Sequence, residues 1–577
     1  MNAKRLLALF DRVSEAPDAV AKLRRFVLDL AVRGKLVDQD PADEPAEDLL
    51  RRIQDEKTRR IAAGEYRKDK AANSDPDDPP FALPSSWRWS RLSEIGFLNP
   101  RVSAPSDTEA GFVPMPLVAA EHGVANRHEP RPWGQISSGY THFAEGDVGL
   151  AKITPCFENG KSTVFRGLPN GIGAGTTELH IVRPVLVDPD FILLLLKSAH
   201  FIESGIPRMT GTAGQKRVPS DYFANSPFPL PPLAEQRRIV ARVDGLMTLC
   251  DQLEAARADR EHRRDRLTSA TMANVGRSTS SMSSADQRFV IDTLPALTGR
   301  VRQLEHARRA IQDLAVRGRL VEQNAEDESS QVLLRRATEA KLVACADEGI
   351  RSRQPIARRN RDDLWFDFPE SWTLPAFDDV FVIASGVTKG QKVASVEAVD
   401  APYLRVANVQ RGRLDLAVIK TITVRRADVE RYALRVGDVL MTEGGDWDKL
   451  GRAAVWRGEV AGCIHQNHVF RVRAPTADIL PEWVTTYVNS PLGRAFFADA
   501  SKQTTNLASI NMTQLRGCPI PLPPLAEQRR IVARVDELIT LCDQLEASLA
   551  AADTANARLL DAILHEALNG PLQAEAA

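Results

Sequence analysis

Four short stretches carry residue types that could do chemistry, and the surroundings of each argue against it. "DDPPF" at 77–81 has the Asp-Pro-Pro-aromatic pattern with which a methyltransferase loop can hold a target amine. That loop needs a preceding strand and a Gly-rich cofactor turn, whereas a charged, Pro-rich linker precedes this stretch. "NGIGAG" at 170–175 is a glycine run, but the strand-like "TTELHIV" follows it. We expect a hairpin there, because a phosphate site needs a helix N-terminus.

The other two stretches also lack the partners that their chemistry needs. "ENGKS" at 158–162 ends like a Walker A phosphate loop, but Pro155 stands where the first glycine belongs. "CIHQNH" at 463–468 lies in a strand-like context that offers no set of four metal ligands. The sequence also shows no nucleophile elbow, no HExxH and no carboxylate cluster with nuclease spacing. We therefore expect no catalytic residue and no metal site, and interpret the chain as a non-enzyme.

The composition bounds the class of protein. With 577 residues the chain is too long for one core, and its length predicts about three or four domains. The net charge of −1 gives by itself no reason to expect a nucleic-acid or acidic-lipid partner. The six cysteines lie far apart without a CxxC pair, which favours free thiols in a reducing compartment. The longest apolar run, "FILLLL" at 191–196, is too short to span a bilayer, so we expect a soluble, cytoplasmic protein.

An internal repeat dominates the sequence. "PLPPLAEQRRIVARVD" at 229–244 recurs at 521–536, and the identity continues to Ala255 and Ala547 with only two differences. Upstream, "RRFVLDLAVRGKL" at 24–36 matches "RRAIQDLAVRGRL" at 308–320 at most positions. The order of these segments indicates a tandem duplication, with a Ser-rich seam at 276–287.

Each repeated segment predicts a long helix with coiled-coil spacing. About 40 helical residues would reach ~60 Å, which is more than a flanking domain needs for its own core. An ordinary amphipathic core helix remains the alternative, but two copies in one chain favour antiparallel pairing about a pseudo-twofold axis. The expected core positions are Ile239, Val243, Leu246, Cys250 and Leu253 in the first copy, and Ile531, Val535, Leu538, Cys542 and Leu545 in the second.

The blocks between the repeated segments differ in sequence but share a layout. Both show strand signals, and a "GDV" triplet at 146–148 and at 437–439 predicts in each a turn that leads into a strand. "GTAGQKRVPSDYF" at 211–223 stands where the second half has "QTTNLASINMTQL" at 503–515. A copied frame with divergent contents suggests one scaffold that presents two different recognition surfaces.

Several stretches together resemble the specificity subunit of type I restriction–modification systems. They are "LAVRGKLVDQDPADEPAEDLLRRI" (30–53), "PFALPSSWRWSRLSEIG" (80–96), "TTNLASINMTQL" (504–515) and both copies of "PLPPLAEQRRIVARVD". The resemblance implies two target recognition domains, each reading one half of a bipartite asymmetric DNA site, and a helical spacer that sets the gap. It implies catalysis by partners: two modification subunits that use S-adenosylmethionine, and restriction subunits that use ATP and Mg²⁺. No cofactor is implied in this chain.

The predicted fold class is α+β, with two mixed α/β recognition domains separated by long antiparallel helices. The expected parts are a helical region and linker (1–75), recognition domain 1 (80–232), the first repeated helix (233–275), the Ser-rich linker (276–287), a central helical region (288–360), recognition domain 2 (364–524) and the second repeated helix (525–570).

Neither recognition domain is a basic block, so we expect DNA contacts from local clusters. Glycines permit close backbone approach, glutamine can pair with adenine, and lysine or arginine with phosphate or guanine. On that basis we predict DNA contacts from Thr212, Gln215, Lys216, Arg217, Lys389, Gln391, Lys392, Lys502, Gln503 and Thr504. As partner-docking residues we predict outward charges of the repeated helices, namely Arg237, Arg238, Arg529 and Arg530.

Two alternatives remain at this point. A single-chain restriction–methylation enzyme would need its own cofactor turn and catalytic loop, and would bind S-adenosylmethionine by itself. A coiled-coil scaffold that does not bind DNA would leave no footprint even with its partners present.

Overall fold

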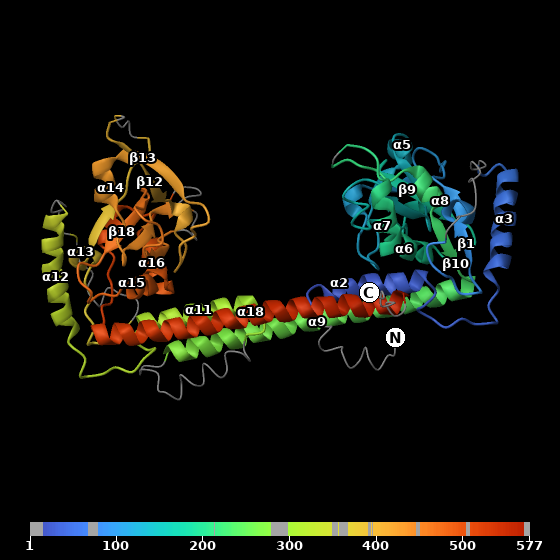
Figure 1. The fold of residues 1–577 in the computed structure, drawn as a ribbon. Helices are drawn as coiled ribbons and strands as arrows, with labels where there is room; N and C mark the ends of the chain where they lie inside the picture. The colour runs from blue at the N-terminus through green and yellow to red at the C-terminus, as the bar shows by residue number, and fades with distance from the viewer. Residues whose placement is uncertain are drawn as a thin grey trace, which may run out of the picture. The chain divides into compact units, whose positions relative to one another are not determined.

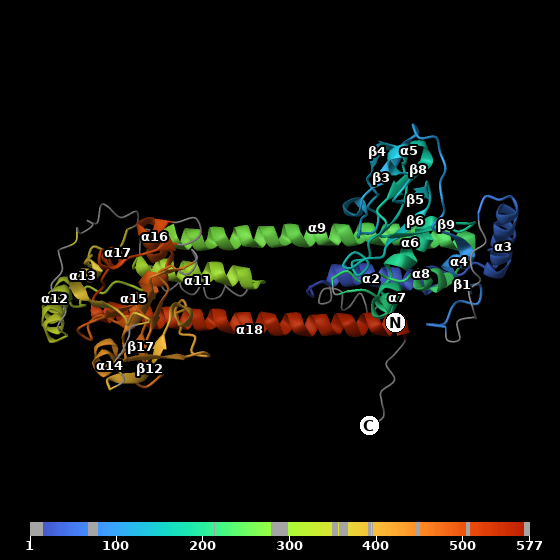
Figure 2. The ribbon, with the colours of Figure 1, turned by 90° about the horizontal axis from the view of Figure 1, so that it is seen from above.

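The computed structural model of the chain describes residues 15–66, 79–212, 214–277, 298–348, 356, 367–390, 394, 396–445, 450–503 and 508–569. The chain divides into two compact units: unit 1 is Met1–Asp259 with Ala552–Ala577, and unit 2 is Arg260–Ala551. Figures 1 and 2 label many of the helices and strands of both. Each unit therefore holds one copy of the duplicated sequence and the end of the repeated helix that belongs to the other copy.

In the described part of unit 1, helices α2 (Ala19–Val32) and α3 (Ala46–Ala62) precede its recognition domain. The domain has two four-stranded sheets, in the orders β2-β9-β6-β7 and β4-β3-β8-β5. The first comprises β2 (Gly96–Leu98), β9 (Leu179–Pro184), β6 (Val148–Ala151) and β7 (Ser162–Val164). The second comprises β4 (Glu129–Pro132), β3 (Glu109–Val113), β8 (Ile172–Gly175) and β5 (Thr141–Ala144). The helices are α4 (Leu92–Ile95), α5 (Trp133–Ile136), α6 (Pro189–Lys197), α7 (Ala199–Gly205) and α8 (Ser220–Asn225).

Unit 2 repeats this arrangement. Helices α11 (Val301–Val316) and α12 (Ser330–Asp347) precede a domain with sheets in the orders β11-β18-β14-β16, β13-β12-β17 and β15-β20-β19. The strands of the first two are β11 (Val382–Ser385), β18 (Val469–Arg473), β14 (Val439–Thr442), β16 (Ala453–Val455), β13 (Lys420–Arg425), β12 (Ala398–Leu404) and β17 (Ile464–His465). The third contains β15 (Gly444–Gly445), β20 (Ala508–Ser509) and β19 (Lys502–Gln503). The helices are α13 (Phe377–Val380), α14 (Arg426–Tyr432), α15 (Pro481–Asn489), α16 (Pro491–Ala500) and α17 (Met512–Arg516).

The two recognition domains share one topology although their sequences differ. Strands β11, β18, β14 and β16 pair antiparallel in the order of β2, β9, β6 and β7. The second sheets share a parallel pair, β3 with β8 and β12 with β17, beside an antiparallel neighbour. The prediction of an α+β fold with two mixed recognition domains is confirmed, since the duplication retained the backbone frame in both halves.

Each domain is closed where its ends meet at the repeated helix. In unit 1, β1 (Arg88–Arg91) pairs antiparallel with β10 (Pro227–Leu230). In unit 2, isolated bridges join Thr373 to Leu522 and Ala376 to Pro519. Because the prolines that follow cannot donate a ladder hydrogen bond, the strand ends there and the helix begins.

The two "GDV" triplets form the predicted turns. Gly146 and Gly437 have positive φ angles of 84° and 93°, which glycine adopts without a steric penalty. The carboxylate of Asp147 accepts a hydrogen bond of 2.7 Å from the backbone N–H of Ala144. Asp438 accepts one of 2.7 Å from the N–H of Arg435. Strands β6 and β14 begin at the next residue in each case.

The repeated segments form helices α9 (Leu233–Arg277) and α18 (Leu525–Asn569). Most of their predicted core residues are buried: Ile239, Val243, Cys250, Ile531, Val535, Leu538 and Cys542. Leu246, Leu253 and Leu545 are partly exposed. The first turns of both helices pack into the core of their own recognition domain, where Ile239 lies with Phe228 and Ile531 with Leu522. The helices therefore serve as core helices at their start, in addition to carrying the coiled-coil pattern.

The segment from α2 through α3 in unit 1 and the segment from α11 through α12 in unit 2 are equivalent, and each is called the central helical region of its unit. Its first helix, α2 or α11, is the central helix, and it contacts the start of one repeated helix and the end of the other. In unit 1, Arg24 of α2 pairs with Asp251 and Glu254 of α9, while Lys22 pairs with Asp561 of α18. In unit 2, Arg308 of α11 pairs with Asp543 and Glu546 of α18. The side chain of Gln303 donates to Asp265 of α9. Each unit thus contains the start of one repeated helix and the end of the other, as the predicted antiparallel pairing requires.

The repeated "LAVRG" segment has a steric reason for its glycine. Gly34 and Gly318 both have a φ angle of 66°. A Cβ atom would lie 2.5 Å from Cγ of Pro84 at Gly34, and 2.4 Å from Cγ of Pro369 at Gly318. The central helical region thus meets the start of each recognition domain at a contact that only glycine fits.

Candidate nucleic-acid interface

The "LAEQRR" motif occurs at the start of both repeated helices. In each half it connects the repeated helix with the central helical region and with the recognition domain. Its glutamate is almost fully buried and accepts a hydrogen bond from a glutamine that follows the central helix: Gln39 donates to Glu235 at 2.6 Å, and Gln323 donates to Glu527. Glu527 also accepts from the indole N–H of Trp372 at 2.9 Å. Burial raises the pKa of both Glu235 and Glu527. The motif therefore holds the repeated helix against the central helical region.

The next residue of the motif links the helix to the recognition domain. The side-chain carbonyl of Gln236 accepts from the N–H of Asp188 at 2.9 Å, and that of Gln528 accepts from the N–H of Leu480 at 2.9 Å. These two residues directly precede helices α6 and α15, so each glutamine satisfies a backbone donor at a helix start.

The four predicted docking arginines fall into two classes. Arg237 and Arg529 are exposed. Arg238 instead makes a bidentate pair with Asp43 at 2.6 and 3.1 Å, and Arg530 makes one with Asp327 at 2.7 and 3.1 Å. The guanidinium groups of Arg238 and Arg530 therefore already hold the central helical region, whereas Arg237 and Arg529 face outward as expected.

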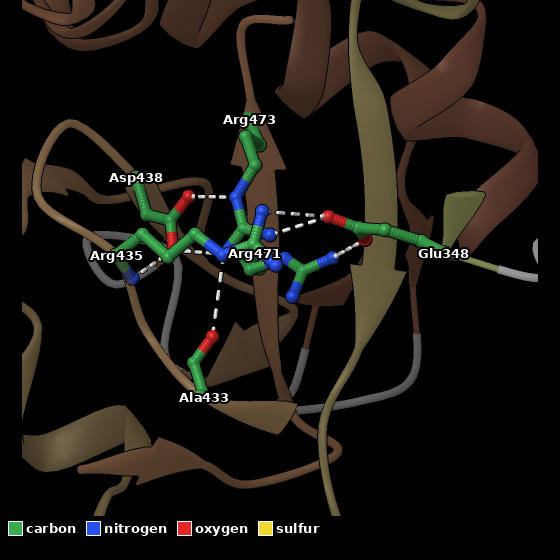
Figure 3. Close-up of polar contacts among 6 residues, drawn as sticks. All are labelled: Glu348, Ala433, Arg435, Asp438, Arg471 and Arg473. Atoms are coloured by element: carbon green, nitrogen blue, oxygen red, sulfur yellow. Dashed lines mark hydrogen bonds and ion pairs between the residues drawn. The ribbon is translucent and has the colours of Figure 1, made fainter. Parts of the chain in front are cut away.

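An arginine with most of its side chain covered stabilises the main sheet of each recognition domain, with 18% of the side chain exposed at Arg183 and 11% at Arg473. Arg183 on β9 forms two hydrogen bonds of 2.7 Å with Asp147 of the first "GDV" turn, and its Nη1 donates to the hydroxyl of Tyr66. Arg473 on β18 pairs with Asp438 at 2.6 and 2.7 Å and also reaches Glu348, which caps α12 (Figure 3). The arginine thus ties the segment that follows α3 or α12 to the sheet.

The second network is the larger one. Arg471, which is 2% exposed, also donates to Glu348 at 2.7 Å, and Arg435 lies 3.4 Å from the same carboxylate (Figure 3). Burial alone would raise the pKa of Glu348, but Arg471 and Arg473 lower it overall. Removing one member of such a network leaves a buried charge uncompensated.

A short hairpin lies at one end of this sheet in both domains. In unit 1, Thr210 pairs with Arg217, and Arg217 bridges Ile153 next to the end of β6. In unit 2, Lys502 pairs with Ser509, and Ser509 pairs with Gly444 next to the end of β14. The N–H of the following residue, Val218 or Ile510, bonds to the carbonyl of residue 152 or 443 at 2.8 or 2.9 Å. The paired segments that contain Thr210 and Arg217 and those that contain Lys502 and Ser509, called here the first and the second hairpin, are therefore equivalent, as the sequence alignment of the two blocks predicted.

The ladder register brings two more positions to the same place. One residue beyond β6 and β9, the N–H of Lys152 donates to the carbonyl of Glu178 at 2.9 Å. One residue beyond β14 and β18, the N–H of Glu443 donates to the carbonyl of His468 at 3.0 Å. Positions 152, 178 and 217 thus correspond to positions 443, 468 and 509. The first set is Lys, Glu and Arg, and the second is Glu, His and Ser.

The side chains at these positions interact differently in the two domains. Arg217 makes a bidentate pair with Glu178 at 2.8 and 2.9 Å, and this pairing lowers the pKa of Glu178. In unit 2 the ring Nδ1 of His468 contacts the carboxylate of Glu443. Both pairs are partly exposed. The same backbone frame therefore presents a different pattern of charge and hydrogen-bonding groups at its surface in each domain.

A polar pocket of about 240 Å³ lies beside the first set, lined among others by Arg101, Tyr140, Lys152 and Thr177. Arg101 and Lys152 give the pocket itself two basic side chains, and Thr212, Gln215 and Lys216 of the hairpin are exposed. Concave polar surfaces rimmed by lysine and arginine suit contacts with phosphates and base edges.

Comparison with known proteins places this frame in a family. A family model described as "Type I restriction modification DNA specificity domain" matches residues 369–552. The Type I restriction enzyme EcoEI specificity subunit of Escherichia coli is 35% identical over 95% of this chain and 94% of its own length. The EcoAI specificity subunit of Escherichia coli is 34% identical over the same shares. The chain belongs to the type I restriction–modification specificity subunits. Among solved structures, that of the HsdS subunit from Thermoanaerobacter tengcongensis is 21% identical over 85% of this chain and 99% of its own length, with a TM-score of 0.44.

Some of the residues predicted to contact DNA in this specificity subunit lie on the two hairpins, one lies elsewhere, and three lie outside the described residues. Thr212, Gln215, Lys216 and Arg217 lie together on the first hairpin. Lys389 is exposed in a turn, away from the second hairpin in sequence. Lys502 and Gln503 form β19 of the second hairpin, so their backbone stands at the equivalent place. Gln391, Lys392 and Thr504 lie outside the described residues. Their contacts with DNA stay predictions.

Sequence reasoning missed four residues of this site: Lys152, Glu178, Glu443 and His468. A signal for them exists in the sequence. Lys152 and Glu443 both stand six residues after the glycine of a "GDV" turn, and Glu178 and His468 both stand five residues before the arginine of the main sheet. Aligning the two blocks on these anchors would have paired the positions, but only the strand register shows that they meet the hairpin.

Three of the four stretches whose chemistry the sequence argued against lie in or next to strands, whereas Asp77 and Asp78 of "DDPPF" lie outside the described residues. "NGIGAG" leads into strand β8 rather than a helix, and "ENGKS" leads into β7. In "CIHQNH", His465 is buried on β17 and its Nδ1 contacts the carbonyl of Val469 at 2.7 Å. Within the described ranges, no three His, Cys, Asp or Glu residues gather in a way that could hold a metal ion. No helix in those ranges is both long and apolar enough to cross a membrane.

Proposed function

We propose that this chain is the DNA-specificity subunit of a type I restriction–modification complex, in which each recognition domain reads one half of a bipartite, asymmetric site. The observation that carries this proposal is that both recognition domains have the same backbone frame but different side chains at equivalent surface positions. Residues that hold the frame recur in both domains, such as Arg183 and Arg473, whereas three equivalent surface positions carry different chemistry. Two recognition domains with the same frame and different surface side chains suit a DNA site with two different halves.

The chain acts without chemistry of its own under this proposal. Two modification subunits bind S-adenosylmethionine and methylate an adenine on each strand, and restriction subunits supply ATP- and Mg²⁺-dependent translocation and cleavage. Catalysis then resides in the partners, and no cofactor binds here. The absence of catalytic residues stays a prediction, and "NGIGAG", "ENGKS" and "CIHQNH" lie in strands or in the turns next to them.

The modification subunits dock on the repeated helices under the same proposal. Arg237 and Arg529 support it, because they are exposed at equivalent positions directly after the buried glutamate and glutamine of the "LAEQRR" motif. Arg238 and Arg530 would act indirectly, by fixing the central helices against which a partner packs. The repeated helices also set the length of the unread gap between the half-sites.

The test is a methylome of the host with and without the gene. We expect loss of adenine methylation at one asymmetric two-part motif with a fixed gap, and no change at other motifs. Unchanged methylation in a host whose modification subunits are active would refute the proposal. Tight binding of S-adenosylmethionine by the isolated chain would favour the single-chain enzyme instead.

A further inference from the structure

The Arg217–Glu178 pair has a geometry that suits one task in DNA reading. The Nε and Nη2 atoms of Arg217 donate to the two carboxylate oxygens of Glu178 at 2.9 and 2.8 Å. Its Nη1 donates to the carbonyl of Gln215 at 3.1 Å. A guanidinium has five N–H groups, so one remains on each terminal nitrogen after these three bonds. The arginine side chain as a whole is 42% exposed.

We propose that Arg217 reads a guanine in the half-site of the first recognition domain, and that Glu178 positions it. This inference rests on the proposed function. Two adjacent N–H donors in a plane match the N7 and O6 acceptors of guanine in the major groove. Glu178 keeps the guanidinium in one orientation, so the side chain is ordered before DNA arrives and less conformational entropy is lost on binding.

The charge of the pair favours a base over a phosphate as the target. Glu178 neutralises Arg217, which weakens the attraction of the guanidinium for the DNA backbone. The neighbouring Lys216 is exposed and has the mobile point charge that suits a phosphate contact. The hairpin therefore separates two roles: Lys216 contributes affinity for any sequence, and Arg217 contributes selectivity.

The second domain supports a specificity role for this place. Ser509 occupies the position of Arg217, and Glu443 and His468 occupy those of Lys152 and Glu178. None of these three side chains has the forked N–H donors of a guanidinium, so recognition of guanine by an arginine fork is confined to the first domain at this place. In unit 2 the pair at these positions joins His468 to Glu443 instead, so the pairing of the residues at positions 217 and 178 differs between the two domains.

The experiment uses the full chain assembled with its modification subunits. Methylation rates are measured on duplexes in which each base pair of the first half-site is exchanged in turn. We expect the wild type to lose roughly 10- to 100-fold at one G·C pair. Arg217→Ala and Arg217→Lys should abolish that loss at this pair alone, because lysine keeps the charge but not the planar fork. Glu178→Gln should reduce the discrimination while changing binding to a nonspecific duplex little.

Two further variants separate the roles. Lys216→Ala should weaken binding to all duplexes evenly and reduce the slope of log affinity against log salt by about 1. The matched control is Arg166→Ala, since Arg166 forms a similar exposed bidentate pair with Asp190 elsewhere in the domain. It should leave the sequence preference unchanged.

Two outcomes would overturn the inference alone. In one, Arg217→Ala weakens all duplexes evenly, which is the behaviour of a phosphate contact. In the other, Arg217→Ala and Arg217→Lys keep full discrimination at every position of a specific wild-type complex. A wild-type complex without any sequence preference would instead refute the proposed function.

Discussion

Replacing Arg473 with Met is expected to destabilise unit 2 by about 3–5 kcal/mol, because the substitution leaves buried carboxylates without their partner. Asp438 is 1% exposed and accepts two hydrogen bonds from Arg473, and Glu348 accepts a third (Figure 3). We expect a clearly lower urea midpoint and melting temperature. The same change should loosen α12 from the sheet, which limited proteolysis would detect as faster cleavage near residue 348.

A matched control distinguishes burial from charge. Arg457 pairs with Glu482 at 3.2 Å, but its side chain is 65% exposed, so Arg457→Met should cost no more than about 1 kcal/mol. Adding Asp438→Asn to Arg473→Met should restore part of the loss, because the amide can still cap the turn without burying a charge. Equal effects of Arg473→Met and Arg457→Met would contradict this account of the network.

Replacing Glu527 with Gln is expected to lower the free energy of unfolding of unit 2 by about 1–3 kcal/mol. The reason is that the new amide nitrogen must face one of the N–H donors that now bond to Glu527. Both oxygens of Glu527 accept hydrogen bonds, one from Trp372 and one from Gln323. An amide offers only one acceptor, so one of these N–H groups loses its partner in a buried site. We expect a lower melting temperature of unit 2 and weaker association with the modification subunits, since the repeated helix and central helix would no longer be held together.

The control for this change lies on the same helix. Glu537 is 64% exposed and pairs with Arg534 one helical turn away, so Glu537→Gln should change stability by less than about 0.5 kcal/mol. If Glu527→Gln lowered the melting temperature as little as Glu537→Gln, the hydrogen bonds of Glu527 would not be what holds the repeated helix to the central helical region.

Much of the frame could be predicted from local sequence. The duplication, the helix starts after the prolines and the "GDV" turns follow from patterns within a few residues, because glycine, proline and aspartate act on their own backbone. The start of each repeated helix was only half predicted. Its apolar spacing fits both a coiled coil and a domain core, and the contacts of Ile239 and Ile531 show that it first serves the core.

The candidate site was harder to predict because its members meet across strands. Arg217 was selected for its type and its glycine-rich surroundings, but Glu178 lies far away in sequence and joins it only through the strand register. Arg238 and Arg530 show the opposite error. In sequence they look like a solvated basic face, yet each pairs with an aspartate of the central helical region.

Exchange of residues 90–228 for the corresponding segment of another specificity subunit tests the central claim most directly. The exchange keeps both copies of the repeated helix, the central helices and the whole second recognition domain, so the frame that holds the partners is unchanged. Methylome sequencing of a host that carries the chimaera is predicted to show a motif with one new half, the other half unaltered and the same gap. A motif altered in both halves, or methylation still at the original site, would contradict the division between a frame that is copied and contents that read DNA.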